Sequence, residues 1–89
     1  MGIMRDNLKG LGAALDRLGA ELLAAHPLDR KTDELIRFAL SIKGRSAPCV
    51  HKHFRGSRAA GATDAEIANV FALTMRESAG ADECWTARV

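Results

Sequence analysis

The sequence predicts an all-α protein, and three features of its 89 residues support this class. Apolar residues recur at three- and four-residue steps, which places them along one side of a helix. Alanine, the strongest helix former, is abundant, for example in the segment AALDRLGAELLAA. Start and stop signals divide the chain into helical segments, and we expect four to five helices and no strand.

The first predicted helix runs from about Met4 to Ala25. Its apolar stripe consists of Leu8, Leu11, Leu15, Leu18 and Leu22. His26-Pro27 ends this helix because the residue before a proline avoids the helical region. The second predicted helix spans about Asp29 to Lys43, with the aspartate as its N-cap and Gly44 as its C-cap.

The third predicted helix follows a short link and runs from Pro48 to about Ala60. Proline suits a first helical turn because its missing N–H has no partner there in any case. The fourth helix begins at a capping box formed by Thr63 and Glu66, and we expect it to end before Gly80. Residues 81–89 form either a short terminal helix or a frayed end.

Length and composition indicate one small globular domain over residues 1–89. Hydrophobic residues make up 47% and charged residues 27% of the chain, an ordinary globular balance. A chain of this size buries only a small core, so its stability needs a supplement. Two cysteines are too few for a secreted disulfide scaffold, and we therefore expect a homo-oligomer.

Charge and hydropathy argue against a nucleic-acid or membrane partner. The formal net charge is +2, and no recognition motif or aromatic platform accompanies the basic residues of the central segment, which we expect on a solvated surface. These residues are Arg37, Lys43, Arg45, Lys52, Arg55 and Arg58. No apolar run resembles a signal peptide or a membrane span. We expect a cytoplasmic protein with reduced thiols.

Cys49 and His53 are the first candidates for chemistry. They lie four residues apart at the start of the third predicted helix, so their side chains are neighbours on one face. A helix N-terminus and a protonated imidazole both favour the thiolate, which is the nucleophilic form of cysteine. The alternative is a small apolar cysteine beside a hydrogen-bonded histidine, with no chemistry.

Metal binding is a further possibility because Cys49, His51 and His53 form a Cys-x-His-x-His pattern. On one helix, however, His51 points to the opposite side from the other two. Two ligands do not close a zinc site, which usually needs four. We therefore expect no metal and no other cofactor.

A longer pattern surrounds this pair. Glu34 is followed, after eleven intervening residues, by Ser46-Ala47-Pro48-Cys49, then, after three more, by His53, and then by Ala60-Gly61-Ala62-Thr63 and Glu66. This arrangement resembles the alkylhydroperoxidase D-like family, which also contains the carboxymuconolactone decarboxylases. The resemblance covers roughly residues 28–79 and implies an alkylhydroperoxidase-D-like helical bundle that assembles as trimers or hexamers.

The redox branch of the family implies a peroxiredoxin-type antioxidant oxidoreductase. By this resemblance, Cys49 is the thiol that attacks the peroxide, and His53 and Glu34 form a proton relay around it. The partners implied are a small-molecule peroxide and a thiol or disulfide. A buried Glu34 would exchange protons with the pair, whereas burial statistics alone place a glutamate in solvent.

The chain departs from the family motif at Ser46, which stands where the first motif cysteine is expected. Three outcomes remain open. Cys49 works alone and an external thiol resolves it, with Ser46 as a hydrogen-bonding substitute; Cys84 resolves it; or the redox activity is absent.

Two further hypotheses belong to the same fold. The decarboxylase branch resembles the segment His53-Phe54-Arg55-Gly56 and implies a lyase that uses the histidine and needs no cysteine. A non-catalytic assembly protein that has kept the fold is favoured by Ser46.

Overall fold

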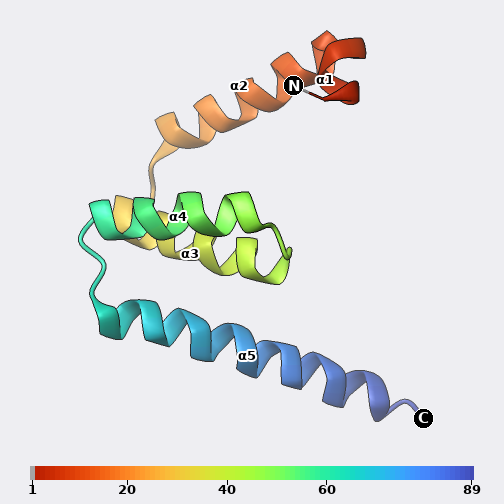
Figure 1. The fold of residues 1–89 in the computed structure, drawn as a ribbon, viewed down its shortest axis with the longest axis vertical. Coiled ribbons are helices and arrows are strands. Elements are labelled where there is room, and N and C mark those ends of the chain that lie inside the picture. The colour runs from red at the N-terminus through yellow and green to blue at the C-terminus, as the bar shows by residue number, and fades with distance from the viewer. Residues whose placement is uncertain (1) are drawn as a thin grey trace.

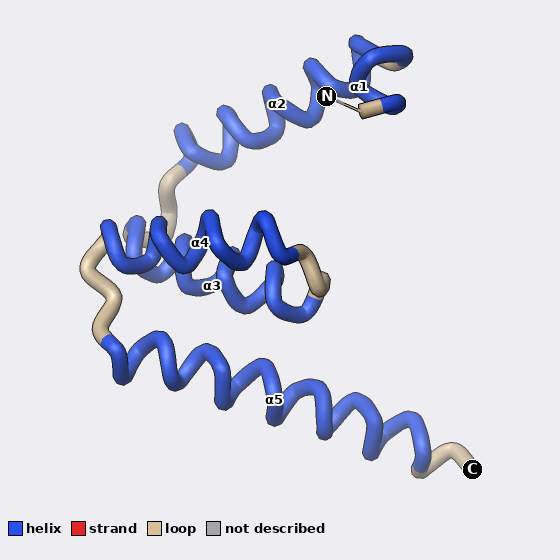
Figure 2. The backbone as a smooth tube through the Cα atoms, viewed as in Figure 1, coloured by secondary structure: helices blue, strands red, loops and turns tan. Residues whose placement is uncertain are grey.

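The computed structural model describes residues 2–89, and this part of the chain contains five α-helices and no strand. Figure 1 shows the helices in chain order, and Figure 2 marks the loops that join them. The helices are α1 (Ile3–Asn7), α2 (Lys9–Ala25), α3 (Arg30–Lys43), α4 (Ala47–Ala59) and α5 (Asp64–Thr86). The all-α class predicted from the sequence is confirmed.

Helices α3 and α4 form an antiparallel hairpin at the centre of the molecule (Figure 1). Asp29 caps α3, and its carboxylate accepts a hydrogen bond of 2.8 Å from the backbone N–H of Thr32. Gly44 follows the last turn of α3, and Arg45 adopts a left-handed conformation with φ 55°. Pro48 then lies in the first turn of α4, as expected.

Phe38 on α3 is the centre of the core and is 1% exposed. Its ring packs in tilted geometry against Phe54 of α4, with centroids 5.9 Å apart, and against Phe71 of α5, with centroids 5.8 Å apart. The other buried apolar residues are Ala62, Ile67 and Val70. Phe38 of α3 therefore contacts both α4 and α5.

Helix α5 begins at the predicted capping box. The backbone N–H of Thr63 donates to Glu66, and the hydroxyl of Thr63 accepts from the backbone N–H of Glu66. The predicted end before Gly80 is wrong, because the helix continues to Thr86. A glycine inside a helix costs only about 1 kcal/mol relative to alanine, too little to stop a long helix.

The predicted first helix is divided in two. Leu8 leaves the helical region with φ −125° and ψ 65°, and α1 folds back against α2. Arg5 fixes this turn: its guanidinium donates to the carbonyl of Gly12 at 3.3 Å and pairs with Asp16 at 3.0 Å.

Helix α2 projects away from the rest of the molecule (Figure 1). Within residues 2–89 it packs against α1 and not against α3, α4 or α5. The radius of gyration is accordingly 16.1 Å, whereas a compact chain of this length has about 12 Å. No helix of the described chain has both the length and the apolar character needed to cross a bilayer.

Candidate functional site

The start of α4 brings three of the predicted site residues to one pocket. Ser46 is the N-cap residue with an extended backbone, Cys49 lies in the first turn, and His53 lies one turn later. The pocket has a volume of about 320 Å³. Its lining residues are Arg37, Leu40, Ser41, Gly44, Ser46, Cys49 and His53. Cys49 is exposed and is a free thiol, not part of a disulfide, so a small molecule in solution can reach it.

Glu34 reaches the same histidine from α3. Its Oε2 atom lies 3.0 Å from Nδ1 of His53, and the two side chains are 17% and 13% exposed, respectively. An ionised carboxylate can only accept hydrogen bonds, so the Nδ1–H group is the donor in that state. The imidazole is thereby fixed in the tautomer whose Nε2 atom carries the free lone pair.

These positions divide the site into two layers. Cys49 and His53 line the pocket, whereas Glu34 does not line it and contacts Nδ1 of His53. His53 can therefore exchange a proton with a group in the pocket while Glu34 holds the ring in place. This arrangement can perform general base chemistry on a thiol or on another group bound in the pocket.

Ser46 lines the pocket, whereas the second cysteine, Cys84, does not. Ser46 is half-buried and, within the described chain, its hydroxyl makes no capping hydrogen bond to α4. Cys84 is exposed near the end of α5 and is also a free thiol. In Figure 1 the last turns of α5 extend beyond the α3–α4 hairpin, and no disulfide joins the two cysteines in the described chain.

Sequence analysis missed two residues that shape this site. Arg37 lines the pocket, and its Nε donates to Asp33 at 2.8 Å, although we had expected it on a solvated surface. Its spacing of three residues from Glu34 was the available signal. Gly56 packs against the Glu34 carboxylate, and a glycine three residues after His53 inside a predicted helix was the corresponding signal.

Potential metal ligands are not clustered in residues 2–89. No three or more His, Cys, Asp or Glu side chains of this part of the chain gather closely enough to hold an ion. His51 is exposed and does not line the pocket.

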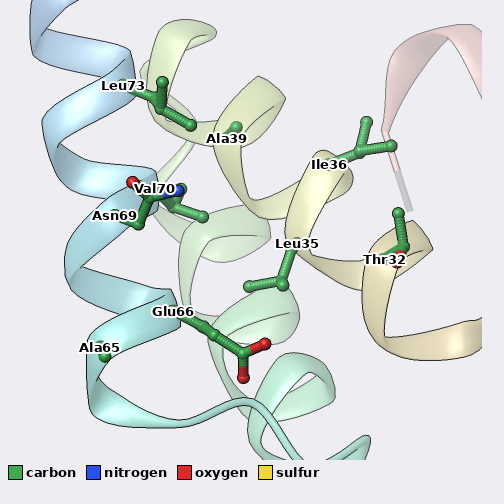
Figure 3. Close-up of a pocket in the computed structure, with 9 residues that line it drawn as sticks. All are labelled: Thr32, Leu35, Ile36, Ala39, Ala65, Glu66, Asn69, Val70 and Leu73. Carbon is green, nitrogen blue, oxygen red and sulfur yellow. The ribbon is translucent and has the colours of Figure 1, made fainter.

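A larger apolar groove lies between α3 and α5, away from Cys49 and His53 (Figure 3). It has a volume of about 460 Å³, and its apolar walls include Leu35, Ile36 and Leu73. Among the described residues, no cysteine, serine or histidine lines this groove, and its walls resemble a surface that packs against another helix. The chemistry is therefore assigned to the smaller pocket.

Comparison with known proteins identifies the family of the chain. No curated protein is similar enough to the chain to count as a relative. The sequence matches the carboxymuconolactone decarboxylase family over residues 9–88, a span that includes every residue of the pocket and Glu34. The chain therefore belongs to the carboxymuconolactone decarboxylase family.

Proposed function

We propose that this protein is a thiol-dependent antioxidant oxidoreductase with peroxiredoxin-type alkylhydroperoxidase activity. Cys49 is the nucleophile, His53 is its base, and Glu34 completes the proton relay. The observation that carries the proposal is the hydrogen bond of 3.0 Å between Glu34 and His53, directly behind a pocket that exposes Cys49. We infer a cytoplasmic location, where the thiols stay reduced.

In the first step the Cys49 thiol loses its proton to Nε2 of His53. The thiolate attacks the terminal oxygen of a hydroperoxide, so a sulfur–oxygen bond forms as the oxygen–oxygen bond breaks. Sulfur is oxidised by two electrons and becomes a sulfenic acid. The departing alkoxide takes the proton from the imidazolium and leaves as an alcohol.

The second step restores the thiol. Since Ser46 has no sulfur, a small external thiol attacks the sulfenic acid, forms a mixed disulfide and releases water. A second external thiol then releases Cys49 and leaves as the oxidised external disulfide. Cys84 of a neighbouring subunit is the alternative resolving thiol, provided that assembly brings its sulfur within bonding geometry.

The test is consumption of cumene hydroperoxide by reduced protein in the presence of dithiothreitol. We expect turnover by the wild type, none by Cys49→Ser, and near wild-type rates for Cys84→Ser if the external thiol resolves Cys49. The proposal fails if the wild type consumes no hydroperoxide and Cys49 is alkylated no faster than a free thiol.

A lyase of the decarboxylase kind is the second candidate, favoured by the family match and by Ser46 in place of a motif cysteine. In this reading His53 transfers a proton to or from a lactone acid, and Glu34 orients the ring. Cys49→Ser would then leave turnover intact while His53→Gln abolishes it. If neither reaction occurs, the protein is a non-catalytic assembly protein that retains the fold.

We also propose that the protein is a homo-oligomer, a trimer or hexamer, in which other copies cover α2 and the groove of Figure 3. The accessible surface is 6924 Å², roughly 1,800 Å² more than a compact monomer of 9.6 kDa exposes. Specific interfaces bury about 800 Å² on each partner, so the excess on one chain matches about two interfaces, as each subunit of a ring has. Sedimentation equilibrium tests this, and a monomer at micromolar concentration would contradict it.

A further inference from the structure

The backbone of Gly56 lies so close to the carboxylate of Glu34 that no residue with a Cβ atom would fit at position 56. A Cβ atom built at position 56 would lie 2.4 Å from Oε2 of Glu34, 2.7 Å from Cδ and 3.1 Å from Oε1. The Oε2 atom is the same oxygen that pairs with His53. Alanine or any larger residue therefore cannot share this space with the carboxylate in its present position.

Conformational freedom does not explain this glycine. Gly56 lies inside α4, where the backbone is helical and its φ angle is not positive. A glycine at such a position weakens the helix relative to alanine. What position 56 provides is the absence of a side chain, on the face of α4 that also carries His53.

We propose that Gly56 is a positioning residue, which leaves the space in which Glu34 holds His53 in its Nδ1–H tautomer. Its consequence for catalysis rests on the proposed function, whereas the positioning itself does not. Helix α4 carries both His53 and Gly56, and helix α3 carries Glu34. The carboxylate of Glu34 occupies the space that the missing side chain of Gly56 leaves beside the imidazole. Because the carboxylate ends a flexible side chain, a Cβ at position 56 displaces Glu34 without unfolding the helix.

Gly56→Ala tests this proposal by separating stability from site geometry. We expect helical circular dichroism as in the wild type and a Tm above that of Glu34→Ala, because both variants lose the Glu34–His53 hydrogen bond and Gly56→Ala also gains helix propensity. Long-range ¹H–¹⁵N NMR of the His53 ring should show the Nδ1–H tautomer in the wild type and its loss in Gly56→Ala. A wild-type tautomer pattern in Gly56→Ala would overturn the proposal.

Gly19→Ala is the matched control, since no described atom lies within 4 Å of a Cβ built there and the residue is also inside a helix. It should leave the His53 spectrum unchanged. If Gly56→Ala does not fold, the double variant Glu34→Ala/Gly56→Ala decides the question. Folding of the double variant supports the steric pairing, and failure of both overturns it.

Activity measurements separate this proposal from the proposed function. Loss of the tautomer together with a fall in hydroperoxide turnover to the level of Glu34→Ala supports both. Loss of the tautomer with unchanged turnover supports the positioning role of Gly56 and contradicts the relay. That outcome would contradict the proposed function and leave the role of Gly56 supported.

Discussion

Helix α3 of the hairpin and helix α2 both carry apolar residues at helical spacing, but of the two only α3 buries an apolar side chain in a core within the described chain. Phe38 on α3 is 1% exposed, whereas Leu15 and Leu18 on α2 are 49% and 57% exposed. Both stripes have helical spacing, so periodicity identifies an apolar face but not what packs against it. The hairpin has its core and its candidate site within one chain, whereas α2 is covered only in the oligomer that we propose.

The largest expected effect comes from removing the central core side chain of the hairpin. Phe38→Ala should destabilise the protein by about 3–5 kcal/mol, because it leaves a cavity and removes two aromatic contacts. A chain this small has little stability to lose, so we expect it to unfold, as measured by urea denaturation followed by circular dichroism. A loss below about 1 kcal/mol would show that Phe38 is not the centre of the core.

Charges on the α2 stripe test the other half of the comparison. Leu15→Glu/Leu18→Glu should convert the oligomer to smaller species by size-exclusion chromatography with light scattering, because buried charges without partners are costly in an interface. Asp16→Asn, on the same helix but paired with Arg5, is the control and should keep the assembly. Unchanged assembly of the leucine variant would show that α2 is not an interface.

The Glu34–His53 pair can be broken inside the intact hairpin. Glu34→Ala should cost about 1–2 kcal/mol in urea denaturation, within the range for a partly buried hydrogen bond to a charged group. Hydroperoxide turnover should fall at least about tenfold, because general base catalysis by His53 depends on the orientation of its ring. Glu34→Gln keeps an oxygen acceptor and should lose less stability. Equal turnover in all three proteins would exclude the relay.

The smallest expected effect concerns the ion pair between α3 and α5. The ammonium of Lys31, at 2.9 Å, and the backbone N–H of Thr63 lower the pKa of Glu66 from 4.5 to about 2. Ionised Glu66 therefore stabilises the fold above about pH 4.5, and this contribution is lost as the pH falls toward 2.

Glu66→Gln checks that sign. Its Tm should be slightly below that of the wild type near neutral pH, and the difference should shrink as the pH falls through the acidic range. A difference that does not change with pH would mean that Glu66 acts through its capping hydrogen bonds alone.

The parts of the fold that depend on neighbouring residues could be predicted from the sequence. Asp29 and the pair Thr63–Glu66 mark helix starts through hydrogen bonds within one turn, and they lie where expected. The break at Leu8 could not be predicted, because it depends on Arg5 reaching across to α2. The predicted helix end before Gly80 was wrong because a glycine weakens a helix only slightly and does not by itself end it.

The candidate site also has parts that the sequence predicts and parts that it does not. The spacing of Cys49 and His53 on one helix could be derived from the sequence, and the structure places both at one pocket. The contact of Glu34 with His53 was expected from the family resemblance, since no helical spacing links residues on different helices. Gly56 contacts Glu34 across the α3–α4 interface, and Arg37 lines a pocket that residues of both helices form, so the sequence alone could not show these neighbours.

Mass spectrometry of the two cysteines after a brief exposure to one equivalent of hydroperoxide tests the central claim most directly. The arrangement of Cys49 beside His53 predicts one added oxygen on Cys49, trapped with a sulfenic acid reagent, while Cys84 stays unmodified. It also predicts that the modification is much slower in His53→Gln. Equal oxidation of both cysteines, or an unmodified Cys49, would contradict the assignment of Cys49 as the peroxide-attacking thiol.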